Sequence, residues 1–325
     1  MIGTSKRRGS AVRGGPAVCG GRAARAAGAA GRTLYAVWSR GGGRAALIVI
    51  GVWTAVALVS LVWTPWPLLA TDGYHTWQAP SPAHPLGTDG TGADVLSWLM
   101  AGAATDLAIA LLVALVAAVW GTLLIAAMVS RHGALAGTAV VAVDALISIP
   151  TVLLALILAV PLGASVAVVV CACGFAYGLN LARIARPAAL LAARSAYVES
   201  ALANGASGMG VLIRHILPNS LPVIAVQLSM SAGTALLAEA GLTYLGVGVP
   251  SGVPSWGHSL TTSVRFVTVY PAAVLWPGLV VTVAVVALNL LGDALRDATD
   301  PAAVGSAPPA DAVEPDGTGE VRDGR

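Results

Sequence analysis

The chain has 325 residues, of which 57% are hydrophobic and 10% are charged, and its formal net charge is +3. Because soluble domains carry about 25% charged residues, this composition excludes an ordinary soluble protein. Several apolar runs approach or exceed the roughly 20 residues that a helix needs to cross a bilayer. Helices satisfy their own backbone hydrogen bonds in lipid, so we predict an all-α, polytopic membrane protein.

The charges are concentrated at the two ends of the chain. Nine of the eighteen basic residues precede Ala45, and seven acidic residues follow Asp293. Polar ends without apolar periodicity are typical of disorder, so we predict a basic disordered cytoplasmic tail over residues 1–44 and an acidic one over residues 301–325. The basic tail favours contact with anionic membrane lipid, and it contains no recognisable module for binding nucleic acid.

Six apolar stretches are expected to form transmembrane helices, namely residues 45–62, 107–129, 134–160, 164–181, 221–245 and 271–291. Pro150 predicts a kink in the third stretch near Ser148. Gly174 and Gly178 give the fourth the G-x-x-x-G spacing that allows close helix contact. An even number of spans and a basic N-terminal tail place both termini in the cytoplasm. The chain thus divides into a first span with an external loop (45–104) and a core (105–300).

A polar segment, residues 195–220, separates the fourth and fifth spans. Four arginines lie in or near it, which predicts a cytoplasmic position: Arg183, Arg186, Arg194 and Arg214. We expect a short helix capped by Ser195, a break at Gly205 where a residue without Cβ is favoured, and a second short helix that Pro218 ends before the fifth span.

This segment resembles a loop of known membrane proteins. Read with a gap, five of its residues fit E-A-A-x3-G-x9-I-x-L-P, the coupling loop of ABC-importer membrane subunits: Glu199, Ala201, Gly205, Leu217 and Pro218. Residues 84–107, 238–260 and 277–301 resemble the "C-type" permease subunits of dipeptide, oligopeptide and nickel importers. The chain departs from that pattern at Ser200, where the family usually has Ala, and at Gly208 and Gly210, which replace better helix formers.

The resemblance implies a binding-protein-dependent permease subunit of the cell membrane. Such a subunit forms half of a translocation path with a second permease subunit, for peptides or similar small solutes. Two ABC ATPase subunits dock on the coupling loops of the two permease subunits, and an extracytoplasmic solute-binding protein delivers the substrate. The pattern does not distinguish dipeptides from oligopeptides or nickel complexes.

The chain has no nucleotide-binding loop of its own. Its only lysine is Lys6, preceded by Ser5, so the Gly-Lys-Ser/Thr end of a phosphate-binding loop is absent. ATP hydrolysis is therefore expected in the partner ATPases, and we expect no catalytic residue, cofactor or metal.

Two acidic residues lie in the predicted spans. Asp144 is expected to be a buried charge in the third span, where an unpaired charge costs at least roughly 3 kcal/mol, so we predict an ion pair with Arg183 or Arg186. Glu239 lies near the external end of the fifth span, and a structural or gate role is expected there.

Polar residues also recur on the fifth span. Gln227, Ser231 and Thr234 follow one another at i, i+4 and i+7, within about 60° on a helix, and we predict that they line the path. The alternative is that they bond to neighbouring helices.

Two other classes of protein are alternatives. An ion-coupled secondary transporter needs ionisable residues near mid-membrane, and only Asp144 comes close. A non-transporting scaffold subunit would not need the glycine and proline punctuation of residues 195–220.

Overall fold

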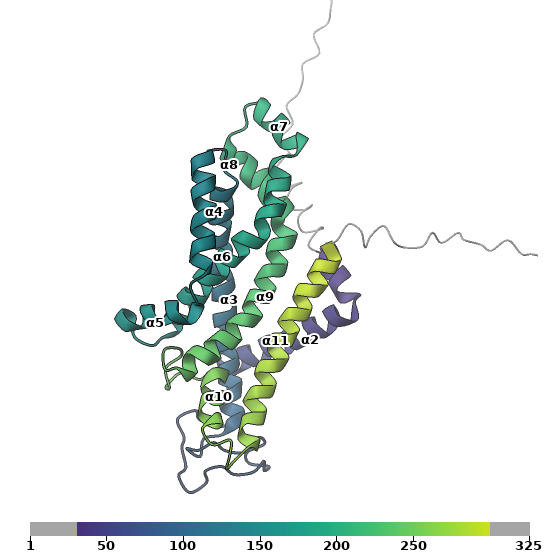
Figure 1. The fold of residues 1–325 in the computed structure, drawn as a ribbon. Helices are drawn as coiled ribbons and strands as arrows, with labels where there is room; N and C mark the ends of the chain where they lie inside the picture. The colour runs from purple at the N-terminus through teal and green to yellow at the C-terminus, as the bar shows by residue number, and fades with distance from the viewer. Residues whose placement is uncertain (1–30, 300–325) are drawn as a thin grey trace, which may run out of the picture.

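The computed structural model describes residues 31–299, and this part of the chain contains helices and no β-strand (Figure 1). The prediction of an all-α fold is confirmed. In chain order the helices are α2 (Gly41–Ser60), α3 (Val95–Met128), α4 (Gly133–Ile147), α5 (Thr151–Leu162), α6 (Val166–Ala193), α7 (Ala196–Ala203), α8 (Gly208–Val211), the π-helical turn η1 (Leu212–Ile216), α9 (Leu217–Tyr244), α10 (Trp256–Val264) and α11 (Ala272–Thr299).

Five of the six predicted spans correspond to helical stretches that are long and apolar enough to cross a membrane. The third predicted span corresponds to the pair α4 and α5, which is bent by 86° and is a sixth span only if the two helices are counted as one. The break falls at residues 148–150, so the kink predicted from Pro150 is confirmed. Proline disfavours helical geometry in the residue before it, which ends α4 there.

The helical region begins earlier than predicted. Residues 31–38 are helical and α2 starts at Gly41, so the expectation of disorder up to residue 44 is wrong for residues 31–44. Val37 is 1% exposed, and a Cβ at Gly43 would overlap its carbonyl oxygen. This packing orders a stretch that composition alone describes as a tail. Residues 1–30 and 301–325 lie outside the described part, and their predicted disorder is untested.

The fifth span is longer than predicted because Pro218 does not end a helix. The turn η1 joins α8 to α9, so that Gly208–Tyr244 is one helical stretch of 37 residues, roughly 55 Å at 1.5 Å per residue. Pro218 has no N–H for the preceding turn. The wider i→i+5 pattern of η1 accommodates that loss.

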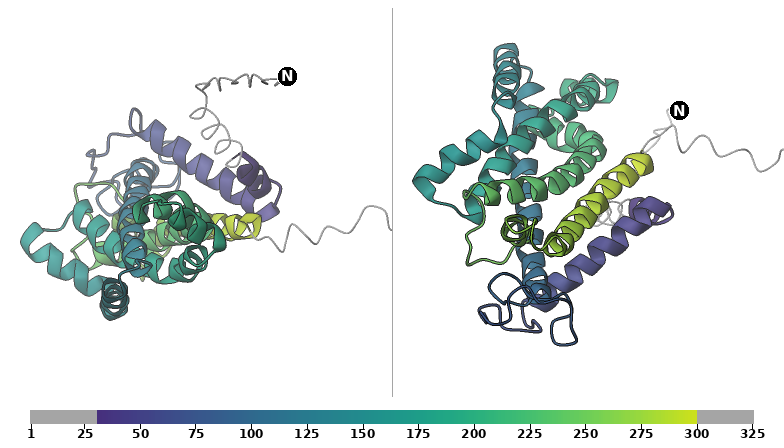
Figure 2. Two further views of the ribbon diagram at one scale, coloured as in Figure 1. Left: turned by 90° about the horizontal axis from the view of Figure 1, so that it is seen from above. Right: turned by 60° about the horizontal axis from the view of Figure 1, so that its bottom comes forward.

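The two ends of the molecule are built from different segments. In Figures 1 and 2, α7 and α8 lie at one end, whereas α10 and the long loop between α2 and α3 lie at the other. Asp94 holds the loop to the start of α3, because its Oδ2 accepts from Ser97 N at 2.8 Å and its Oδ1 lies 2.9 Å from His84 Nδ1.

Close contact between α3 and α6 forms the centre of the fold. A Cβ at Gly174 would lie 2.6 Å from Val116 Cγ1, and one at Gly178 would lie 2.8 Å from Trp120 Cδ1. The close approach predicted from the G-x-x-x-G spacing is confirmed. From the α3 side, a Cβ at Gly121 would lie 2.9 Å from the carbonyl oxygen of Gly178.

We therefore predict that Gly121→Ala destabilises the chain by about 1–3 kcal/mol, because the added methyl meets backbone that cannot rotate away. The measurement is thermal unfolding of the purified chain in detergent. Gly51→Ala in α2 is the control, since no atom lies within 4 Å of its added Cβ and alanine favours a helix. Equal melting temperatures for both variants would contradict the packing argument.

Candidate functional site

The segment over residues 195–220 folds as a helix, a glycine turn and a second helix. After α7 the backbone of Gly205 has φ +84°. Its N–H donates to Leu202 O and the N–H of Ala206 donates to Ala201 O, both at 3.0 Å, which is the Schellman arrangement. The glycine break predicted at Gly205 is confirmed, and a residue with a Cβ would cost about 1–2 kcal/mol in this conformation.

The prediction that the Ser195 side chain caps the first short helix is wrong. Ser195 stands at the N-cap position of α7, but its hydroxyl donates to Ala192 O at 2.6 Å and so closes the last turn of α6 instead. Ser207 caps α8, because its Oγ accepts from Gly210 N at 3.1 Å.

One face of α7 packs against an apolar cluster of the chain, and the opposite face is exposed. Val198 is buried, and Ala201 and Leu202 pack against the same apolar cluster. Glu199 is exposed in the first turn of α7. Leu217 is half-buried and Pro218 exposed where α9 begins.

A hollow of about 630 Å³ lies beside α7, between the end of α3 and the start of α8. Its rim carries one acidic side chain, two basic side chains, a histidine and a methionine: Glu199, Arg131, Arg194, His132 and Met209. All five are exposed. This end of the molecule therefore presents a concave, charged surface next to the glycine turn.

The polar stripe predicted on the fifth span is interrupted. Ser231 is 2% exposed, so the prediction that it faces a path is wrong for this conformation: the α9 surface at that position is covered by neighbouring helices. Gln227 is half-buried and Thr234 is exposed, with the Thr234 hydroxyl donating to its own helix at Ser231 O, 3.0 Å away. Lining by Gln227 and Thr234 stays a prediction.

Asp144 forms an ion pair, but it is not buried within the chain. Its Oδ1 lies 3.7 Å from Arg183 Nε, and the two side chains are 53% and 59% exposed respectively. The predicted pairing is confirmed with Arg183, whereas the predicted burial is wrong. The reason is the position of α4 at the edge of the bundle, where Val143 is its buried residue.

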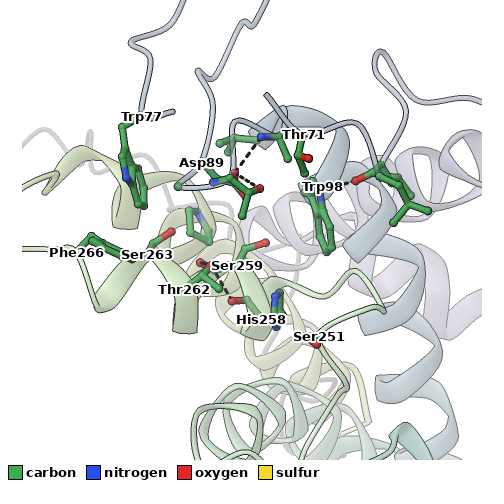
Figure 3. Close-up of a pocket in the computed structure, with 17 residues that line it drawn as sticks. Thr71, Trp77, Asp89, Trp98, Ser251, His258, Ser259, Thr262, Ser263 and Phe266 are labelled. Atoms are coloured by element: carbon green, nitrogen blue, oxygen red, sulfur yellow. Dashed lines mark hydrogen bonds between the residues drawn. The ribbon is translucent and has the colours of Figure 1, made fainter. Parts of the chain in front are cut away.

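The opposite end of the molecule holds a cavity of about 470 Å³ between the α2–α3 loop and α10 (Figure 3). Trp77, Trp98 and Phe266 supply aromatic walls, and Asp89 and His258 supply polar atoms. Six hydroxyl groups also line it: Thr71, Thr91, Ser251, Ser259, Thr262 and Ser263. The volume and the mixed lining are typical of small-molecule sites.

The polar groups of this cavity are held in place. Asp89 Oδ1 accepts from Thr91 N at 2.8 Å and from Ala93 N at 3.0 Å. Burial lowers the pKa of His258, although the nearby Asp89 charge acts in the opposite direction. His258 is therefore neutral at pH 7. This cavity was not predicted from the sequence, because its residues come from segments far apart in the chain.

Glu239 is fully buried where α9 meets α10. It is 1% exposed, and its Oε1 accepts from Thr243 Oγ1 at 2.9 Å and from Ser255 Oγ at 3.1 Å. A second buried carboxyl group, Asp106 of α3, accepts from Trp256 N at 2.8 Å. Asp106 was not singled out from the sequence, because it stands alone within an apolar run. Within residues 31–299 no group of three or more His, Cys, Asp or Glu is gathered as metal ligands would be.

Comparison with known proteins identifies the family. Residues 110–304 match the model of the family described as "Binding-protein-dependent transport system inner membrane component". The chain is 37% identical over 236 residues to the "Probable peptide ABC transporter permease protein y4tQ" of Sinorhizobium fredii, covering 72% of this chain and 80% of that protein. It is 34% identical over 225 residues to the glutathione transport system permease protein GsiD of Pectobacterium atrosepticum, covering 69% of this chain and 74% of that protein. The chain therefore belongs to this family of inner membrane components and is a transmembrane permease subunit of a peptide-type ABC importer.

Proposed function

We propose that this subunit forms half of the translocation path for peptides or similar small solutes, and that a distinct second permease subunit forms the other half. Two ABC ATPase subunits bind the coupling segments of the two permease subunits on the cytoplasmic side, one of them at residues 195–220 of this chain, and both termini lie on that side. An extracytoplasmic solute-binding protein delivers substrate at the end that carries α10. The relatives that transport peptides and glutathione support the substrate class.

The observation that carries this proposal is the continuity of the helix from the coupling segment to the opposite end. The stretch Gly208–Tyr244 begins directly after the glycine turn at Gly205. When ATP binding draws two coupling segments together, a rigid helix transmits the displacement along its whole length. A flexible joint at Pro218 would have absorbed the same movement.

Glu199 is proposed as a contact to the ATPase. It is exposed on a helix whose other face is packed against the core, so its removal leaves the fold intact. The adjacent hollow, with Arg131 and Arg194 on its rim, would accept an inserted side chain of the ATPase. Gly205 would fix the angle between α7 and α8 that shapes this hollow.

The Asp144–Arg183 side is proposed to face the second permease subunit. Asp144 lies eleven residues from the start of α4 and Arg183 ten residues from the end of α6, which is roughly 15 Å along each helix. This distance is about half the thickness of a bilayer of about 30 Å, so we propose that the pair lies within the membrane and not on the cytoplasmic side predicted for Arg183. Charged side chains there avoid lipid and face protein or a water-filled path.

We predict that Glu199→Ala leaves the melting temperature unchanged and lowers the affinity for the ATPase subunit at least about tenfold, because a hydrogen bond to a charged group contributes about 1.5–3 kcal/mol. Co-purification and a binding titration measure this. Ser200→Ala is the control, since it changes the neighbouring exposed residue and keeps the charge. Unaltered ATPase binding by Glu199→Ala would remove the residue from the interface.

We predict that Arg183→Ala reduces assembly with the second permease subunit more than Asp144→Asn does, because it leaves an unpaired carboxylate inside the bilayer. Recovery of the permease pair from membranes is the measurement. The double variant Asp144→Ala with Arg183→Ala should recover better than Arg183→Ala alone. Normal assembly in all three would mean that this ion pair faces water.

We predict that Gln227→Cys and Thr234→Cys, in a chain without its three native cysteines, react with a water-soluble thiol reagent in the assembled importer. Ser231→Cys is the matched control on the same helix and should be protected, because position 231 is buried. Trapping ATP should alter the rates at 227 and 234. Protection at 227 and 234 with intact transport would place the path elsewhere.

A further inference from the structure

Two buried carboxyl groups from different spans meet at the first turn of α10. Asp106 of α3 and Glu239 of α9 are each 1% exposed. Asp106 Oδ2 accepts from Trp256 N, and Glu239 Oε1 accepts from Ser255 Oγ. A Cβ added at Gly257 would overlap the carboxyl oxygens of Glu239. Three consecutive residues at the start of α10 therefore contact the two acids.

No basic side chain balances these acids within residues 31–299. The ion pairs found there involve other residues. The two carboxyl groups interact electrostatically with each other. Cys173 of α6 is close enough to Glu239 to interact electrostatically with it as well. His258 of α10 lines the external cavity. The remaining positive field is the N-terminus of α10, equivalent to roughly half a charge, whereas burying two negative charges costs several kcal/mol each.

Hydrogen bonding decides which acid carries the negative charge. Glu239 receives two hydroxyl donors on Oε1, and such bonds stabilise a carboxylate. Asp106 Oδ1 is buried and has no hydrogen-bond partner among the described residues. A charged oxygen without a donor is more costly there than a protonated one. The proton therefore belongs on Asp106.

We propose that Asp106 and Glu239 form a proton-binding site that holds one proton on Asp106 Oδ1 and one charge on Glu239, and that this proton keeps α10 docked on α3 and α9. Loss of the proton places two negative charges against the same turn and releases it. Because α10 supplies His258, Ser259, Thr262 and Ser263 to the external cavity, its release opens that cavity. This site goes beyond the transport role proposed above, and its test needs no transport.

The sign of the pH effect follows from the charge. The folded chain with α10 docked keeps the proton on Asp106 at a pH where the unfolded chain has lost it. The free energy of unfolding therefore falls as pH rises, until the folded chain also loses the proton. His258 does not produce this effect, because its pKa is lowered from 6.5 by burial and it titrates only at more acidic pH. Measurements above about pH 6.5 exclude His258, Cys173→Ala excludes the thiol, and the comparison with Asp106→Asn separates the acid pair from the other titrating groups of the chain, such as His84 beside Asp94.

The first experiment is thermal unfolding of the purified full chain between about pH 6.5 and about pH 9. We expect the melting temperature of the unaltered chain to fall by about 3 °C or more. Asp106→Asn, a neutral isostere that still accepts from Trp256 N, should show no fall and should melt above the unaltered chain even at the acidic end, because an unfolded Asp106 is already ionised there. A flat profile for the unaltered chain, or an equal fall in Asp106→Asn, overturns the proposal.

The second experiment reports the position of α10 even if Asp106→Asn does not fold. Thr262→Cys is placed in the external cavity of an otherwise cysteine-free chain, and Tyr74→Cys, at a position 97% exposed in the same external region, corrects for thiol ionisation. We expect the labelling rate at 262 relative to 74 to rise severalfold over the same pH range. A constant ratio would show that α10 stays docked and contradict the proposal.

Discussion

The permease is organised by a helix that passes through two prolines without ending. Pro218 and Pro222 have no N–H to donate, yet helical structure continues from Gly208 to Tyr244. The π-helical turn over Leu212–Ile216 absorbs the mismatch. Ser220 is buried in this stretch, and its hydroxyl donates to Ile216 O at 3.0 Å within the same helix. One element therefore joins the glycine turn to the residues that contact α10.

Two pairs of charged groups inside the spans have different requirements. Asp144 and Arg183 have opposite signs and are more than half exposed, so they neutralise each other and need only a polar or protein surface beside them. Asp106 and Glu239 have the same sign and are buried, so no arrangement of neighbouring apolar groups satisfies them. Only removal of one charge does so, which is why a proton is required there.

A feature of this fold is predictable from the sequence when neighbouring residues in the chain determine it, and it is not predictable when contacts between distant segments determine it. Apolar length determined the six spans, and the turn at Gly205 was predictable because its conformation disfavours every residue with a Cβ. Pro218 was misjudged because tertiary packing continued the helix beyond a local breaker. The burial of Asp144 and Ser231 was misjudged because it depends on which helices lie beside them, and periodicity along one helix does not specify its neighbours.

The external cavity could not be predicted from the sequence for the same reason. Its geometry depends on how the first turn of α10 fits against its neighbours. Its walls come from the α2–α3 loop and from α10, and α10 is fixed by its first turn rather than by its length. Glycine at position 257 is required because the Glu239 carboxyl group occupies the space of a Cβ. A glycine that makes room for a buried acid shows that helix and acid are fitted to each other. The docked position of α10 is therefore a specific state, and a change in the charge of that acid pair acts directly on the cavity.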